Sequence, residues 1–191
     1  MKLEDLLEVI QVQRHDFLNH LQVISGLLQL NKFDRAREYL GQVNREMGHS
    51  SLTVRVKIPE VTVALLSSLC ESARFQIELD LKVNSRLEEP GLPGPVAGEA
   101  LEKCLAAAFR FLSPIEVADR HLEVVIDENA KNYSCRLSFP KPSGFEPGLV
   151  EEELKKVDEI AGPYGGRIKL ALSGEKVEIF FIIPRKRTEN G

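Results

Sequence analysis

The residues best suited to chemistry lie in one short stretch near the N-terminus, Arg14-His15-Asp16-Phe17-Leu18-Asn19-His20. Near neutral pH the imidazole of His15 is often unprotonated, which makes it a nitrogen nucleophile. Asp16 can orient that imidazole or hold its proton, and Asn19 can hydrogen-bond a phosphoryl oxygen or an incoming water. The pattern favours a phosphoryl acceptor. The alternative is an ordinary surface histidine beside a solvated aspartate and a surface amide.

The element that must hold these residues is a helix predicted over residues 3 to about 30. Its apolar residues recur at alternating spacings of four and three, which is typical of a coiled-coil seam facing a partner helix. The seam positions are Leu3, Leu7, Ile10, Phe17, Leu21, Ile24 and Leu28, with Arg14 as the polar exception. His15 follows Arg14 and therefore points away from the seam. Its neighbours on the helix surface are Val12, Asn19 and Gln22, so we expect an outward face that is open to in-line attack.

A second helix is predicted to follow a tight turn at Asn31-Lys32, with Asp34 as its N-cap, and to run to about Gly48. Its apolar stripe consists of Ala36, Leu40, Val43 and Met47. Two helices joined by a short turn form an antiparallel hairpin, and a lone hairpin leaves apolar surface in water. We therefore expect residues 1–50 to form a phosphoacceptor and dimerisation domain, in which two copies of the chain build a four-helix bundle.

After an irregular linker over 49–59, the chain predicts a second domain over residues 60–191. The expected order is helix 60–74, strand 75–83, loop 88–98, helix 99–112, strands 121–126 and 133–139, loop 140–148, helix 149–161, and strands 167–172 and 177–183. The buried face expected for the helix 99–112 comprises Leu101, Leu105, Ala108, Phe109 and Leu112. The fold class is therefore α+β: a helical hairpin followed by an α/β sandwich with helices over one face of a mixed sheet.

Composition and charge narrow the classes of function. The 191 residues are 43% hydrophobic and 28% charged, as in ordinary soluble proteins, and the net charge of −4 gives no support for nucleic-acid binding. No N-terminal run resembles a signal peptide, and no apolar run approaches the roughly 20 residues that span a bilayer. We therefore expect a cytoplasmic protein without a membrane segment. The widely spaced Cys70, Cys104 and Cys135 are expected to be reduced and buried or half-buried.

A metal site is not expected. His15 and His20 stand five residues apart, unlike the i, i+4 pair that grips zinc, and His49 and His121 form no cluster with them. A His-Asp pair also occurs in metal-dependent phosphohydrolases, but those enzymes need further histidines and an aspartate on neighbouring helices. The sequence also has no Gly-rich phosphate loop with a lysine.

The segment from Arg14 to Leu30 closely resembles the phosphoacceptor box of one group of two-component proteins, the sporulation initiation phosphotransferase B proteins and the citrate-type sensor histidine kinases related to them. The resemblance implies that His15 carries the phosphoryl group, with Asp16 and Asn19 at the family's acidic and asparagine positions. It also implies a dimeric four-helix bundle followed by an α/β domain related to kinase ATP-binding domains. The segment from Gly162 through Pro184 resembles the end of such a domain.

The second domain departs from that family where a working kinase binds ATP. Ala107 and Phe111 stand where the family's magnesium- and phosphate-binding helix carries asparagines, and neither side chain can ligate a metal. The expected Asp-x-Gly-x-Gly segment reads Ser138-Phe139-Pro140-Lys141-Pro142-Ser143-Gly144, and the glycine-threonine turn is replaced by Gly174-Glu175-Lys176-Val177. We therefore expect that this chain binds neither ATP nor another cofactor.

These inferences predict a homodimeric histidine phosphotransferase of a sporulation-type phosphorelay, without ATP-dependent kinase activity. By resemblance, its partners are the receiver domains of two response regulators, which supply Mg²⁺, and His15 passes the phosphoryl group between their aspartates. Val12, Arg14 and Gln22 are predicted to contribute to regulator docking, where Arg14 either neutralises phosphoryl charge or sets the helix register. The alternatives are a divergent sensor histidine kinase that still uses ATP, and a non-catalytic protein that binds a regulator.

Overall fold

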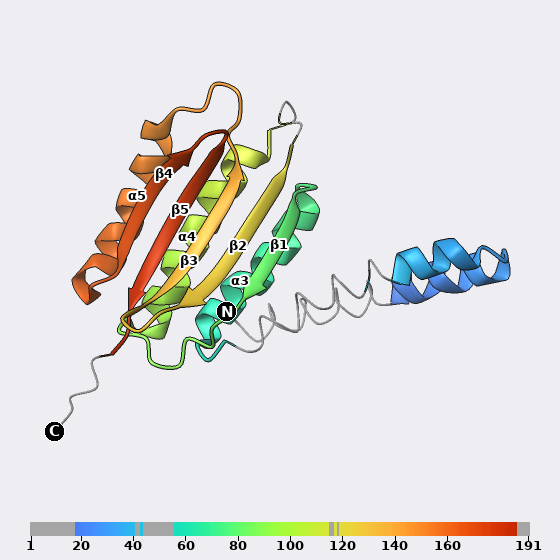
Figure 1. Cartoon of the computed structure of the whole chain (residues 1–191), viewed down its shortest axis with the longest axis horizontal. Helices are drawn as coiled ribbons and strands as arrows, with labels where there is room; N and C mark the ends of the chain where they lie inside the picture. Colours follow the sequence, from blue (N-terminus) through green and yellow to red (C-terminus); the bar gives the residue numbers. More distant parts are fainter. Residues whose placement is uncertain (1–17, 41–42, 44–55, 115–116, 118, 187–191) are drawn as a thin grey trace. The chain divides into compact units, whose positions relative to one another are not determined.

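The computed structural model describes residues 18–40, 43, 56–114, 117 and 119–186 (Figure 1). The chain divides into two compact units, Met1–Gly48 and His49–Gly191, which are described separately. Within the described residues, no helix is long and apolar enough to cross a membrane. The predicted domain limits at residues 50 and 60 stay a prediction, because most of the linker 49–59 lies outside the described residues.

The first unit contains two helical segments, 18–29 and 33–40, and Val43 is also helical. Asn31 follows the first helix in the left-handed region of the backbone, with a φ of 53°. The N–H of Lys32 donates to the carbonyl of Leu27 at 2.9 Å, and the N–H of Asn31 donates to the carbonyl of Leu28 at 3.0 Å. This pair of bonds is a Schellman motif, which asparagine tolerates better than most residues. The turn predicted at 31–32 is therefore confirmed.

The second helix begins earlier than the sequence predicted. The carbonyl of Lys32 accepts a bond from the N–H of Ala36 at 3.0 Å, so Lys32 occupies the N-cap position and Asp34 lies within the first turn. The prediction of Asp34 as N-cap is wrong because the motif that ends the first helix places Lys32 directly at the start of the second. The charge of Asp34 still favours this helix, since a carboxylate in the first turn opposes the positive end of the helix dipole.

The described part of the second unit consists of five strands and three α-helices (Figure 1). In chain order these are α3 Pro59–Arg74, β1 Glu78–Val83, α4 Gly94–Leu112, β2 His121–Glu128, β3 Asn132–Pro140, α5 Pro147–Ala161, the short 3-10 helix η1 Gly162–Tyr164, β4 Arg167–Ser173 and β5 Lys176–Pro184. The strands lie in the order β1-β2-β3-β5-β4. β1 and β2 are parallel, and the other neighbouring pairs are antiparallel. The predicted α/β sandwich with a mixed sheet is confirmed.

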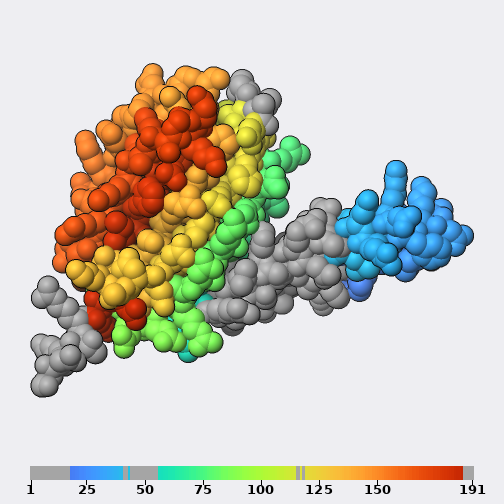
Figure 2. All heavy atoms as spheres, viewed as in Figure 1, coloured from blue at the N-terminus to red at the C-terminus, as the bar shows by residue number. Residues whose placement is uncertain are grey.

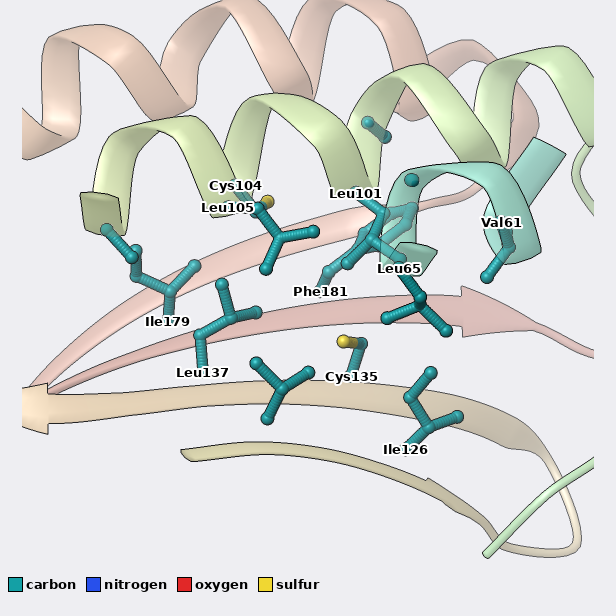
Figure 3. Close-up of a cluster of buried hydrophobic side chains, with 14 of the residues drawn as sticks. Val61, Leu65, Leu101, Cys104, Leu105, Ile126, Cys135, Leu137, Ile179 and Phe181 are labelled. Carbon is teal, nitrogen blue, oxygen red and sulfur yellow. The ribbon is translucent and has the colours of Figure 1, made fainter. Parts of the chain in front are cut away.

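The core lies between the sheet and the helices that cover one of its faces (Figure 3). Along β5 the residues alternate, so that every second side chain is buried in this core. The five residues predicted as the buried face of α4 are all 3% exposed or less, which confirms that face: Leu101, Leu105, Ala108, Phe109 and Leu112. The largest fully buried side chains come from the sheet and are Tyr133, Phe139 and Phe181.

Two element boundaries differ from the prediction by three residues or more. β1 begins at Glu78 rather than residue 75, because Gln76 takes a φ of 55° and the N–H of Ile77 returns to the carbonyl of Ser72 at 2.8 Å. The apolar alternation that predicted the strand therefore begins in residues that end α3. α4 begins at Gly94 rather than Glu99. A proline is tolerated in the first turn of a helix, because the backbone N–H that it lacks would have no partner within the helix there.

None of the described helices of the second unit covers the opposite face of the sheet, and a space-filling view shows its strands lying side by side at the surface (Figure 2). Charged side chains from four strands link up across it. Lys82 approaches Asp80 at 2.9 Å and Glu123 at 2.6 Å. Arg136 approaches Glu123 at 2.9 Å and Glu178 at 3.1 Å. The hydrogen bond from Lys82, with help from Arg136, lowers the pKa of Glu123.

The three cysteines form no disulfide. Cys104 and Cys135 are buried in the core, where Figure 3 shows both thiols. Burial raises the pKa of Cys135 to about 12 and that of Cys104 further, because an apolar surrounding disfavours the thiolate. These two residues agree with the prediction. Cys70 is exposed, so the prediction of a buried or half-buried thiol is wrong there, since this residue lies on the outer side of α3.

Candidate functional site

The predicted phosphoacceptor face is described in part. His15, Asp16, Val12 and Arg14 lie outside the described residues, so their geometry stays a prediction. Asn19 and Gln22 lie on the helix 18–29, and both are exposed. Residues three apart on a helix share one face, so these two project on the same side. The described end of the predicted site is thus a polar, accessible helix surface.

The two helices of the hairpin are joined by a polar contact that sequence reasoning missed. Nδ1 of His20 and the hydroxyl oxygen of Tyr39 are 2.9 Å apart and hydrogen-bonded. The two rings lie 5.8 Å apart between centroids, at an interplanar angle of 53°. This contact fixes the first helix against the second directly beside Asn19. No signal in the sequence identifies it, because pairing residues 20 and 39 requires the register between the two helices.

The hairpin exposes an unusual amount of apolar side chain. Ala36 and Val43 are buried at 2% and 6% exposure, but seven larger apolar residues of the same unit are between 42% and 66% exposed. They are Leu18, Leu21, Val23, Leu28, Leu30, Phe33 and Leu40. Leu21 and Leu28 are seam positions of the predicted coiled coil. Within the described residues, a single hairpin therefore leaves these two seam positions in contact with water.

In the second unit, the helix predicted to correspond to a nucleotide-binding helix carries apolar residues at the two decisive positions. Ala107 is completely buried in α4. Phe111, one turn further on, packs edge-on against Phe145, with their ring centroids 5.3 Å apart. Phe145 precedes α5, and its N–H bonds to the carbonyl of Pro142 at 3.1 Å. These aromatic side chains offer no oxygen or nitrogen ligand to a metal or a phosphate.

The two other segments compared with nucleotide-binding features also have ordinary structural roles. Ser138 and Phe139 belong to β3, where Phe139 is a core residue. The N–H of Lys141 donates to the carbonyl of Glu175 at 2.7 Å, which ties this segment to the β4–β5 turn. Gly174 takes a φ of 59° in that tight turn, a conformation that favours glycine. Among the described residues, no group of three or more histidines, cysteines or acidic residues is placed to hold a metal.

The sheet order and the three helices on one face define the second unit as a histidine-kinase-type ATPase fold, preceded by a helical region. Two solved structures show this likeness. The histidine kinase AdeS of Acinetobacter baumannii has a TM-score of 0.52 and 13% sequence identity, covering 91% of this chain and 98% of that one. The histidine kinase ThkA, in complex with the response regulator protein TrrA, has a TM-score of 0.54 and 12% identity, covering 97% of this chain and 64% of that one.

Sequence comparison points to the same class of proteins. Residues 1–56 match the family described as the sensor kinase SpoOB-type alpha-helical domain. The sensor protein CitS of Halalkalibacterium halodurans is 31% identical over 86 residues, which is 44% of this chain and 16% of CitS. This chain therefore aligns with only a small part of that relative. The similarities connect it to two-component proteins of the histidine kinase type.

Proposed function

We propose that this chain is a histidine phosphotransferase, which accepts a phosphoryl group from the aspartate of one response regulator on His15 and passes it to the aspartate of another. The match of residues 1–56 to a SpoOB-type helical domain supports a phosphoacceptor hairpin. The ThkA structure contains a response regulator protein, which supports regulators as the class of partner.

The observation that carries the proposal over an ATP-dependent kinase is the apolar character of α4 at Ala107 and Phe111. A nucleotide site needs oxygen or nitrogen ligands for magnesium and donors for phosphate. Ala107 has no exposed surface, and Phe111 is packed on Phe145. A chain with an acceptor histidine and no ATP site receives its phosphoryl group from another protein.

In each step of the proposed transfer, one bond to phosphorus forms as another breaks, and both lie within the chain and its regulator. A ring nitrogen of His15 attacks the phosphorus of the regulator's acyl phosphate, a P–N bond forms, and the P–O bond to the aspartate breaks to release its carboxylate. Asp16 accepts the hydrogen bond of the other ring N–H, and Asn19 donates to a phosphoryl oxygen. A carboxylate of the second regulator then attacks the phosphohistidine in the reverse step. Mg²⁺ bound by the regulator offsets the phosphoryl charge.

A homodimer is part of the proposal. The exposed seam residues Leu21 and Leu28 need a cover, and a second hairpin with the same seam supplies one. The resulting four-helix bundle leaves the face of Asn19 and Gln22 outward, where a regulator that also contacts Val12 and Arg14 can dock.

The direct test uses a purified response regulator carrying a radiolabelled acyl phosphate. After mixing with this chain, acid-labile label is expected on the chain, and then on a second regulator. His15→Ala is expected to abolish labelling, and Asn19→Ala to slow it with the amount of bound regulator unchanged. His20→Gln serves as a matched histidine control that keeps label. Equal labelling of His15→Ala refutes the assignment.

Two rivals predict different outcomes. A sensor kinase that still uses ATP, which the fold of the second unit favours, binds MgATP in calorimetry and labels itself from it. A non-catalytic regulator-binding protein forms the complex without ever carrying label. We expect regulator-dependent labelling of His15 and no heat of MgATP binding.

A further inference from the structure

One cleft of the second unit has no part in the proposed phosphoryl transfer. Its volume is about 400 Å³, which is the size of a small-molecule site. Val83 ends β1 and forms one wall together with the residues 84–86 that follow it. Glu128 ends β2, and Arg185 follows β5. β1 and β2 are parallel, and β5 runs in the same direction because β3 is antiparallel to both β2 and β5. The cleft thus lies at the carboxyl ends of three strands (lower edge of the sheet in Figure 1).

This position is where open α/β sheets commonly hold ligands, because loops diverge beyond the strand ends. It is also the end of the sheet opposite the β3–α5 loop and the β4–β5 turn, the two segments that depart from the nucleotide-binding features of a kinase. The register shows the separation: Tyr133, at the cleft end of β3, pairs with Ile183, and Pro140, at the far end, pairs with Lys176. The cleft is therefore separate from any nucleotide site.

A fixed cation stands on one side of the cleft. The guanidinium carbon of Arg185 lies 5.1 Å from the centroid of the Tyr133 ring, and Nη1 donates to the carbonyl of Asn129 at 3.4 Å. Among the described residues, no carboxylate lies within 4.0 Å of this guanidinium. This cation–π contact and the hydrogen bond hold the guanidinium in place while leaving further N–H donors available. Arg185 is thus preorganised to receive a carboxylate or another planar oxyanion.

An anion stands on the other side, the exposed carboxylate of Glu128. Oε2 of Glu128 accepts a hydrogen bond from the hydroxyl of Ser85 at 2.7 Å. Ser85 is 4% exposed, and its oxygen also accepts the N–H of Leu87 at 3.1 Å. Within the described chain, no cation lies within 4.0 Å of the Glu128 carboxylate. The remaining charges, Arg86 and Glu88, offset each other in an exposed pair 3.7 Å apart.

The cleft therefore presents one unpaired charge of each sign together with neutral polar groups. A simple anion is attracted by Arg185 but repelled by Glu128. A simple cation is attracted by Glu128 but repelled by Arg185. A ligand with both charges satisfies both residues. We propose that this cleft binds a small zwitterion of the α-amino acid class, with its carboxylate on Arg185 and its ammonium on Glu128.

The cleft also adjoins the segment that leads into α3. The carbonyl of Arg86 accepts the N–H of Lys57 at 2.7 Å, two residues before α3 begins. A ligand that orders the loop after β1 therefore also orders the residues that lead into α3. The binding proposal itself does not depend on the proposed phosphoryl transfer.

The test is an NMR titration of the full chain with pools of the twenty common α-amino acids at millimolar concentration. At least one amino acid is expected to shift the amide signals of Ser85, Arg86 and Arg185. Its N-acetyl derivative lacks the cation and its amide lacks the anion, so each is expected to bind at least about tenfold more weakly. The absence of shifts in the cleft with every pool refutes the proposal. Equal binding of the N-acetyl derivative also refutes it, because the site is then one for simple anions.

Two variants assign the charges. Arg185→Gln and Glu128→Gln are each expected to weaken binding at least about tenfold. Glutamine at 128 still accepts the hydroxyl of Ser85, so this variant keeps the structure of the cleft. Lys176→Gln, at the other end of β5, is the matched control and is expected to bind normally. Unchanged binding in both cleft variants excludes the proposed contacts.

Discussion

The contact between α3 and α4 depends on a glycine, and an alanine there has a predictable cost. A Cβ built on Gly98 lies 2.6 Å from Cβ of Glu60, 2.9 Å from its carbonyl carbon and 3.0 Å from its carbonyl oxygen. Two of these atoms belong to the backbone of α3, so a side-chain rotation cannot relieve the clash. Forcing the two helices apart costs about 1–3 kcal/mol of overpacking. Replacing glycine by alanine in a helix returns about 1 kcal/mol.

We therefore expect Gly98→Ala to lower the free energy of unfolding by up to about 2 kcal/mol, as measured by urea denaturation followed through a signal of the second unit. Gly148→Ala is the matched control, because Gly148 is exposed in α5 and a Cβ there has no neighbour within 4 Å. That variant is expected to be as stable as the wild type or slightly more so. The reasoning is refuted if Gly98→Ala is as stable as Gly148→Ala.

Three further results are expected. Tyr39→Phe removes the hydroxyl that bonds the first helix, so urea unfolding followed by circular dichroism should show a loss of about 0.5–1.5 kcal/mol, and an unchanged midpoint would contradict this contact. The hydrogen bond from Lys82 lowers the pKa of Glu123. The stabilisation by the Glu123 carboxylate is therefore present above the ordinary pKa of 4.5 and is lost as the pH falls through the lower pKa of the folded state. Glu123→Gln should flatten that part of a curve of Tm against pH. Burial raises the pKa of Cys135 to about 12, so iodoacetamide at about pH 8 should alkylate the exposed Cys70 long before Cys135, as mass spectrometry can show, with both modified in urea.

Periodicity in the sequence predicted most of the fold of the second unit, because burial on one face repeats along every element. The buried face of α4 and the alternation of β5 are examples. Boundaries were harder to predict. Gln76 ends a helix in the left-handed region, yet the apolar residues around it continue the alternation of the strand that follows. The prolines and glycines before Glu99 indicated a loop, although a proline is compatible with the first turn of α4.

The features of the candidate site also divide into those that the sequence predicted and those that it did not. Spacing along one helix predicted that Asn19 and Gln22 share an accessible face, because helix geometry alone fixes that relation. The contact between His20 and Tyr39 depends on how two helices are aligned, which spacing within one helix does not determine. The cleft was missed for a similar reason. Its charged residues Glu128 and Arg185 are far apart in the sequence and meet only through the pairing of the strands.

The ion-paired outer face of the sheet also affects how copies of this chain can meet. Lys82, Glu123 and Arg136 pair laterally with one another while staying in contact with water. Stacking two such faces would strip that water from several charges at once, at a cost of several kcal/mol per ion. The exposed leucines of the hairpin carry no such cost. This face of the sheet therefore resists self-association, which agrees with the proposal that two copies of the chain pair through the hairpin.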